Sequence, residues 1–356
     1  MKKLGLGSGI ARAGCVIALG TALLFLTSIT LAQESPTNEL NLTFEPGNHA
    51  ATGGAQMIYR HSHPANTSAG RSLRAKEIAA SKQIGKNTDG GGGGILQYEG
   101  DLTYQGGSVV DFAQFHAIYL LPNGKCPISA CWGNPEGFLK DLGKSDFIHL
   151  ADQYIGFFGG DRYTLGFHAK LSYTPPSAPL TDADMQEVVY LVASLSGDTG
   201  YNHIYHIFLP PGQDQCFDST DTECYSPDNF NTFFYCGYHS SVTFTDIGHV
   251  LYTVEPYQDV VGCQVKPGSP NGQMVDSTDN VLNHESFETI TDPDGTAWIN
   301  TTLIAMFLDE VGDECSFETV VGENAYFNPP FFSINRHDYG VQSIYSNSLH
   351  ACGTAP

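Results

Sequence analysis

The residues best suited to carry chemistry lie close together, in the segment HESFETITDPDG at positions 284–295. His284 and Glu288 are four residues apart, so on a helix they share one face, one turn apart. Glu285 directly follows the histidine, where zinc proteases of the His-Glu-x-x-His kind keep their general base. The second histidine of that motif is absent, and Glu288 stands in its place.

Two carboxylates beyond this helix are further candidate ligands. A proline follows Asp292 and disfavours helix there, so the chain is expected to turn. In long-motif zinc proteases a third ligand stands ten residues after the first histidine, which is here Asp294, with Asp292 as its rival. We therefore predict a cation held by His284, Glu288 and one of these two aspartates. Glu285 would then polarise a water molecule.

The chemistry of this ligand set leaves two interpretations open. One imidazole and two carboxylates fit calcium, manganese or magnesium at least as well as zinc. Extra negative ligand charge also weakens the Lewis acidity that hydroxide formation needs. The cofactor is therefore predicted as a divalent cation, zinc or calcium, with or without catalysis by Glu285. In the alternative, Glu285 and Glu288 are charges on the helix surface, and His284 is a half-buried structural side chain.

Three further residues are candidates for a second cation or for supporting the first. Glu310 and Asp313 belong to an acidic turn that a disulfide at Cys315 would fix. An acidic surface turn is the alternative for this pair. His239 either approaches the helix of residue 284 as another ligand or packs beside a disulfide. No phosphate-binding loop or dinucleotide fingerprint occurs.

The elements that must position these residues are strands and helices in mixed order. Aromatic and β-branched runs predict strands at residues 115–121, 163–167, 203–209, 231–235 and 249–254. Helices are predicted at residues 137–142, 145–154, 182–194 and 275–291. Thr181 is the expected N-cap of the third, and Asp276, Ser277 or Asp279 that of the fourth. This mixture indicates an α/β (α+β) domain, a mixed β-sheet with flanking helices in a metzincin-like arrangement.

The chain divides into three parts. Residues 1–32 have a basic start, an apolar run and small residues at 30–32, which predicts a cleaved signal peptide. An uncleaved anchor is the alternative, but the run is short for a membrane span. Residues 33–94 end in five glycines and are expected to be a flexible pro-segment or linker. Residues 95–356 are expected to form a single globular domain.

Export changes the interpretation of the cysteines. Removal of the signal leaves eight, and an even count in an oxidising compartment indicates a disulfide-stabilised fold. Short loops favour the pairs Cys126–Cys131 and Cys216–Cys224, and the remaining cysteines would pair as Cys236–Cys263 and Cys315–Cys352.

Charge is distributed unevenly along the chain. Residues 91–356 hold seven Lys and Arg and 33 Asp and Glu, a balance of 7 − 33 = −26. Such a surface repels phosphate backbones, so nucleic acid is excluded as a partner. It suits cation binding and solubility.

Several motifs resemble those of a group of secreted bacterial proteins. These are residues 104–109 (YQGGSV), 162–166 (RYTLG), 180–184 (LTDAD), 236–239 (CGYH), 284–293, 310–315 and 342–347 before the last cysteine. The group is similar to the phosphate-induced protein 1, or EXORDIUM-like, family of plant cell walls. The resemblance covers about residues 95–355 and implies a secreted, extracellular or periplasmic protein with a common fold. It implies no settled chemical activity.

Two functions follow as the main expectations, and a carbohydrate-binding or glycoside-cleaving domain, indicated by the many tyrosines, phenylalanines and carboxylates, ranks last. The first is a secreted metal-binding protein, a zincin-like metallohydrolase acting on peptide bonds. The second is a non-catalytic extracellular or cell-wall factor with a structural cation site. The expected partner is a peptide or a cell-wall polymer, and the mature chain is expected to have no membrane span.

Overall fold

The computed structural model describes residues 39–47, 60–62, 101–229, 231–301, 310–316 and 326–356. All of them belong to one compact unit, Asn38–Pro356. The predicted signal peptide and the five-glycine run lie outside the described residues. Among the described residues, no helix combines the length and apolar character needed to cross a membrane.

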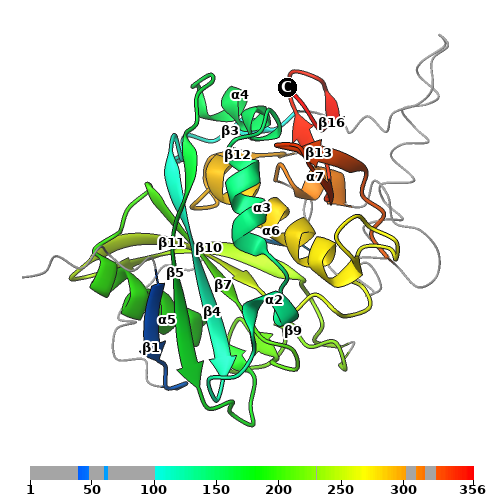
Figure 1. Cartoon of the computed structure of the whole chain (residues 1–356). Helices are drawn as coiled ribbons and strands as arrows, with labels where there is room; N and C mark the ends of the chain where they lie inside the picture. Colours follow the sequence, from blue (N-terminus) through cyan, green and yellow to red (C-terminus); the bar gives the residue numbers. More distant parts are fainter. Residues whose placement is uncertain (1–38, 48–59, 63–100, 230, 302–309, 317–325) are drawn as a thin grey trace, which may run out of the picture. The chain divides into compact units, whose positions relative to one another are not determined.

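A seven-stranded mixed sheet forms the centre of this unit (Figure 1). Its strands stand in the order β1-β5-β4-β7-β11-β10-β2. The first five run parallel to their neighbours, whereas β10 is antiparallel to both β11 and β2. The bounds are β1 Glu39–Thr43, β2 Arg60–Ser62, β4 Ala113–Pro122, β5 Tyr163–Tyr173, β7 His203–Phe208, β10 Gly237–Phe244 and β11 Gly248–Glu255.

Helices cover both faces of the sheet, so the strands are buried on both sides (Figure 1). On one face α5 (Asp182–Ser196) packs against Ile118, Tyr205 and Tyr252 of the central strands. On the other face Phe115, Ile204 and Leu251 pack against a larger set of helices. That set comprises α3 (Pro135–Leu142), the 3₁₀ turn η1 (Phe147–Ala151), α4 (Asp152–Ile155) and α6 (Gln273–Thr291).

Short helices and ribbons complete the described part. The helices are α2 (Ile128–Cys131) and α7 (Asp313–Ser316). The two-stranded ribbons pair β3 (Thr103–Tyr104) with β12 (Trp298–Ile299), β13 (Phe331–Ile334) with β14 (His337–Gly340), and β15 (Ile344–Ser346) with β16 (Ala351–Gly353). A three-stranded sheet joins β6 (Leu180–Thr181), β8 (Gln215–Cys216) and β9 (Cys224–Tyr225).

The predicted fold class is confirmed, because the structure is α+β with a mixed sheet and flanking helices. All four expected disulfides are formed: Cys126–Cys131, Cys216–Cys224, Cys236–Cys263 and Cys315–Cys352. Four cross-links in one chain indicate an oxidising, extracellular type of environment.

Four expectations about elements are wrong. Residues 33–94 are not linker throughout, since β1 and β2 lie in this range and pair with the sheet. Residues 231–235 form a turn and an isolated bridge rather than a strand. Residues 145–154 form a 3₁₀ turn followed by a short helix. Helix α6 starts after Gly272, whose main chain takes the N-cap position, so none of the three expected residues caps it.

Candidate metal centre

Helix α6 is unusual because it is polar and yet buried along most of its length. Every residue from Asp276 to Thr291 is buried, including His284, Glu285 and Glu288. Buried polar groups cost free energy unless they find partners, so the surroundings of this helix must supply them. The expectation of a helix with surface carboxylates is therefore not met.

His284 and Glu288 meet on α6 as their spacing predicts. His284 Nε2 lies 2.9 Å from Glu288 Oε1. The same carboxylate oxygen accepts a hydrogen bond from the backbone N–H of Asp313, at 3.1 Å. The Asp313 carboxylate lies 3.6 Å from His284 Nε2. One oxygen of Glu288 is thus held in place, and its other oxygen points elsewhere.

His239 reaches this cluster from strand β10. Side chains alternate along a strand, so Tyr238 enters the core on the α5 face while His239 faces α6. His239 Nδ1 lies 3.5 Å from Glu288 Oε2 and 3.6 Å from Glu285 Oε2. A Cβ at Gly237, two residues earlier, would meet Val281 at 2.5 Å, so glycine allows this close approach of strand and helix. Of the two alternatives for His239, the structure shows its approach to the helix that carries His284.

The other nitrogen of His239 fixes the state of its ring. His239 Nε2 lies 3.2 Å from the carbonyl oxygen of Asp292, which can only accept. Nε2 therefore carries the hydrogen, and in the neutral ring the lone pair is on Nδ1. Among the described residues, Nδ1 has no hydrogen-bond partner, and it faces two carboxylates. It can bind either a second proton or a metal cation.

In His284 the nitrogen that faces Glu288 is the one that carries the hydrogen, unlike in His239. Gln342 Nε2 donates to the Gly312 carbonyl at 2.9 Å and lies 3.0 Å from His284 Nδ1. The amide nitrogen therefore donates to Nδ1, and the hydrogen of the neutral His284 ring is on Nε2, facing Glu288. In this arrangement the Nε2–H of His284 faces Glu288 and Asp313. These three residues form a second group of possible ligands, but in the neutral ring its nitrogen already carries a hydrogen.

The electrostatics of the cluster follow from burial and close charges. The buried charged cluster of His239, His284, Glu285, Glu288 and Asp313 is at most 3% exposed at any of these residues. Burial lowers the pKa of His239, but the close carboxylates of Glu285 and Glu288 outweigh it and raise this pKa to about 10. Burial raises the pKa of Glu288, but the two histidines outweigh it and hold this pKa at about 2. Burial raises the pKa of Glu285 above its ordinary value. The site thus strongly favours a positive charge at Nδ1.

The two carboxylates expected as third ligands have other partners. Asp294 accepts hydrogen bonds from Tyr201 at 2.6 Å and Ser241 at 2.7 Å, and its carboxylate lies 3.1 Å from His249. The Asp292 carboxylate accepts the backbone N–H groups of residues 296 and 297, both at 2.6 Å, and closes the turn after α6. Neither joins a group of possible ligands with His284 and Glu288 among the described residues. The predicted set is wrong in this respect.

The acidic turn at residues 310–316 also contacts the buried cluster. Glu310 Oε1 lies 3.7 Å from His239 Nε2, and Asp313 contacts both His284 and Glu288. A Cβ at Gly312 would stand 2.9 Å from Glu288 Oε1, so the close packing of this turn requires glycine. Cys315–Cys352 anchors the turn, as the sequence predicted. Glu310 and Asp313 therefore border the cluster as expected.

Two other groups of possible ligands in the described residues do not suit a metal. Cys216 and Cys224 form a disulfide, so their sulfur atoms are not thiolates. In the group of His116, Asp198 and His203, the backbone N–H of Phe167 donates to His116 Nδ1 at 3.3 Å. His116 Nε2 then carries the hydrogen and donates to His203 Nδ1, 3.0 Å away. This pair is a hydrogen-bonded relay rather than a ligand pair.

Comparison with known proteins adds no family to this description. No family model, no curated protein and no solved structure matches the chain.

Sequence reasoning found His284, Glu285, Glu288, His239 and Asp313, and it took His284 as the main ligand and His239 as a supporting residue. Gln342 was noted only as part of a motif, although it sets the hydrogen position of His284. Local spacing could not reveal that role, because 58 residues separate this pair.

Proposed function

We propose that this protein is a secreted protein that binds a divalent cation at the buried cluster between β10 and α6. The ligands are His239 Nδ1 and the Glu288 oxygen that faces it, and the Glu285 carboxylate lies beside the ion position. One observation carries the proposal: a backbone carbonyl fixes the hydrogen of His239 on Nε2, so a lone pair faces two buried carboxylates. Metal-binding histidines commonly donate their other N–H to a backbone carbonyl in this way.

His284 and Gln342 support this centre as positioning residues. His284 and the backbone N–H of Asp313 hold one oxygen of Glu288, and Gln342 holds His284. The second oxygen of Glu288 is thereby aimed at His239. This chain of contacts fixes the ligand geometry before any ion arrives, which lowers the cost of binding.

One nitrogen and several carboxylate oxygens accept zinc, manganese or calcium. When bound, such an ion supplies positive charge to a site that otherwise needs a proton on His239. Four of the motifs that resemble secreted EXORDIUM-like proteins contribute residues to this cluster. They are residues 236–239, 284–293 and 310–315 and the motif that begins with Gln342. We propose membership of that group and an extracellular role on this basis.

The proposal is tested by elemental analysis of natively purified protein for zinc, manganese, calcium and magnesium. The expected result is about one ion per chain in the wild type and none in His239→Ala. His249→Ala is the matched control, because His249 stands on the neighbouring strand β11 and also pairs with a carboxylate. Far-ultraviolet circular dichroism confirms that each variant is folded. Wild-type protein without stoichiometric metal, or equal metal in His239→Ala, refutes the centre.

Peptide hydrolysis is the second candidate. It is favoured by the Glu285 carboxyl, whose pKa burial raises and which lies beside the same ion position. Metal-loaded wild type and Glu285→Gln would be compared on a mixture of unstructured peptides. Cleavage by the wild type that Glu285→Gln loses while it keeps its metal supports hydrolysis. Metal binding without cleavage in the wild type leaves the non-catalytic extracellular factor as the function.

A further inference from the structure

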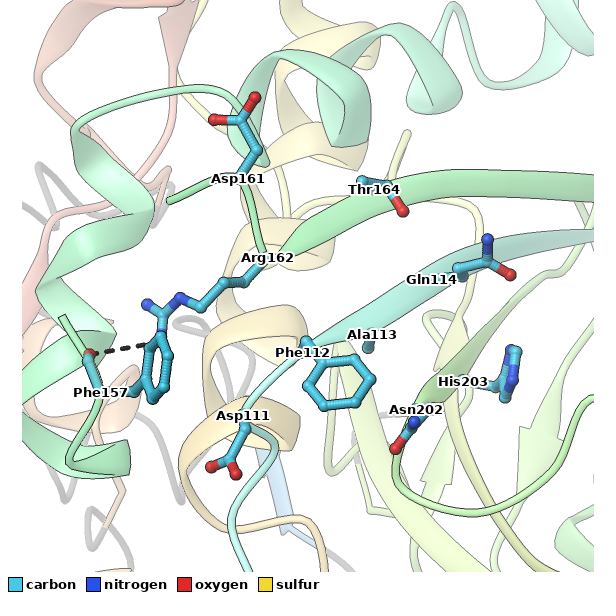
Figure 2. A pocket seen from close by; sticks show the side chains of 10 residues that line it. All are labelled: Asp111, Phe112, Ala113, Gln114, Phe157, Asp161, Arg162, Thr164, Asn202 and His203. Atoms are coloured by element: carbon cyan, nitrogen blue, oxygen red, sulfur yellow. Dashed lines mark hydrogen bonds between the residues drawn. The ribbon is translucent and has the colours of Figure 1, made fainter. Parts of the chain in front are cut away.

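A pocket lies at the edge of the sheet where β4, β5 and β7 begin, apart from the buried cluster. It has a volume of about 640 Å³. Figure 2 shows the ring of Phe112 between Phe157 on one side and Gln114 and His203 on the other. None of its lining residues belongs to the proposed metal centre, so the pocket is argued independently of that centre.

The two phenylalanines give this pocket exposed apolar surface. Phe112 is 54% exposed and Phe157 is 56% exposed, whereas the large apolar side chains nearby are mostly buried. Leaving such rings in water forgoes the stabilisation of burying them, so exposed aromatic groups lining a hollow indicate a ligand that covers them.

The Phe157 ring is held in position by a buried charge. The Arg162 guanidinium lies 5.4 Å from the ring centroid, and Arg162 donates a hydrogen bond to the Phe157 carbonyl at 3.3 Å (Figure 2). Arg162 itself forms an ion pair with buried Asp152. A ring fixed by this cation–π contact loses little conformational freedom when a ligand stacks on it.

Polar groups around the rings suit hydroxyl groups. The lining includes the carboxylates of Asp111 and Asp161 and the amides of Gln114 and Asn202. His203 Nδ1 accepts the hydrogen of His116, so the neutral His203 ring offers its Nε2–H as a donor. The lining therefore combines hydrogen-bond donors and acceptors with exposed aromatic faces, which together match the hydroxyls and the apolar faces of a sugar ring.

Charge narrows the class of ligand. Arg162 is the single cationic group in the lining, and Asp152 neutralises it. Two carboxylates remain, which disfavours phosphates, uronates and other anions. We propose that this pocket binds a neutral saccharide, with a sugar ring stacked on Phe157 or Phe112 and its hydroxyls bound by the surrounding carboxylates and amides.

The test is titration calorimetry of the full secreted chain with neutral hexasaccharides of β-linked glucose, xylose and N-acetylglucosamine. At least one is expected to bind with a Kd below about 10 mM. Phe157→Ala and Phe112→Ala are each expected to weaken binding about tenfold, because stacking on an aromatic face is lost. Phe158→Ala is the matched control, since Phe158 is 77% exposed in the same loop but does not line the pocket.

Three outcomes would overturn the inference. The first is that none of the three saccharides binds. The second is equal weakening by Phe158→Ala, which would place the contact outside the pocket. The third is that a lysine-rich peptide binds more tightly than any saccharide and loses its binding in Phe157→Ala. Neither Phe157 nor Phe112 contributes to the buried core, so loss of folding does not explain a negative result.

Discussion

The position of one hydrogen on each histidine decides what the buried cluster can do. His239 and His284 are equally buried and both touch Glu288, so distance alone does not separate their roles. Their second nitrogens do, because His239 faces a carbonyl oxygen and His284 faces the Gln342 amide nitrogen. The same contacts also explain why Glu288 is bound at one oxygen and open at the other. The two hydrogen positions are thus set by one group inside the motif at 284–295, the Asp292 carbonyl, and by one outside it, the Gln342 amide.

Substitution of the two candidate carboxylates distinguishes the observed site from the ligand set that the sequence predicted. Glu288→Gln is expected to abolish metal binding, because it removes the charge that faces His239. Asp294→Asn is expected to keep the metal and to lose about 1–2 kcal/mol of stability with its hydrogen bonds to Tyr201 and Ser241. Elemental analysis and urea unfolding measure both. Loss of metal in Asp294→Asn would instead support the ligand set that the sequence predicted, with His284, Glu288 and Asp294.

Gln342 offers a test of the positioning role. Gln342→Leu removes the donor to His284 Nδ1, frees the ring to change its hydrogen position and should lower metal affinity about 10–100-fold. The affinity is measured by competition with a fluorescent chelator. Gln264→Leu is the control, because Gln264 is a buried glutamine that bonds to Asp259 away from the cluster. Equal affinities in the two variants would contradict the role.

At the scale of elements, the sequence predicted helices better than it predicted the partner of α6. The apolar face of α5 and its N-cap are local signals, and both are confirmed. Strand β10 was missed because its first five residues, GYHSS, include no β-branched residue. It is a strand because β11 and β2 pair with it on both sides, and such pairing depends on residues far away in the chain. The residues of the cluster could therefore be predicted from the sequence, but not the strand that brings His239 to α6.

The capping box of α5 allows a quantitative check at this scale. Thr181 accepts the backbone N–H of Asp184, and the Asp184 side chain accepts the backbone N–H of Thr181 at 2.7 Å. Thr181→Ala leaves helix N–H groups without this partner and is expected to cost about 1 kcal/mol. Ser194→Ala, at an exposed position of the same helix, should change stability by less than about 0.5 kcal/mol. Urea denaturation measures the stability of both variants. An equal loss of stability in the two would contradict a stabilising role of the Thr181 cap.

At the scale of the whole molecule, the sequence predicted the class of fold and the disulfides. It did not predict which part of the chain belongs to the central sheet. The range 33–94 is poor in large apolar residues, which favours a linker. Nevertheless β1 extends the sheet beside β5, because backbone pairing at a sheet edge needs no apolar run.

Two histidines of the central strands, His116 and His206, are buried, and their protonation makes the stability of this sheet depend on pH.

The sheet is expected to lose stability in mild acid. Burial, reinforced by a neighbouring histidine, lowers the pKa of His116 and of His206 to about 3, against about 6.5 in the unfolded chain. Between these values the unfolded chain binds protons that the folded protein excludes. The stability is therefore complete above pH 6.5 and falls as the pH drops toward 3, by about 2 kcal/mol per histidine between pH 7 and pH 5. Urea unfolding at these two pH values measures the difference. His116→Gln should reduce it, while His350→Gln, at an exposed position, should not, and an unchanged difference in His116→Gln would show that other groups cause the loss.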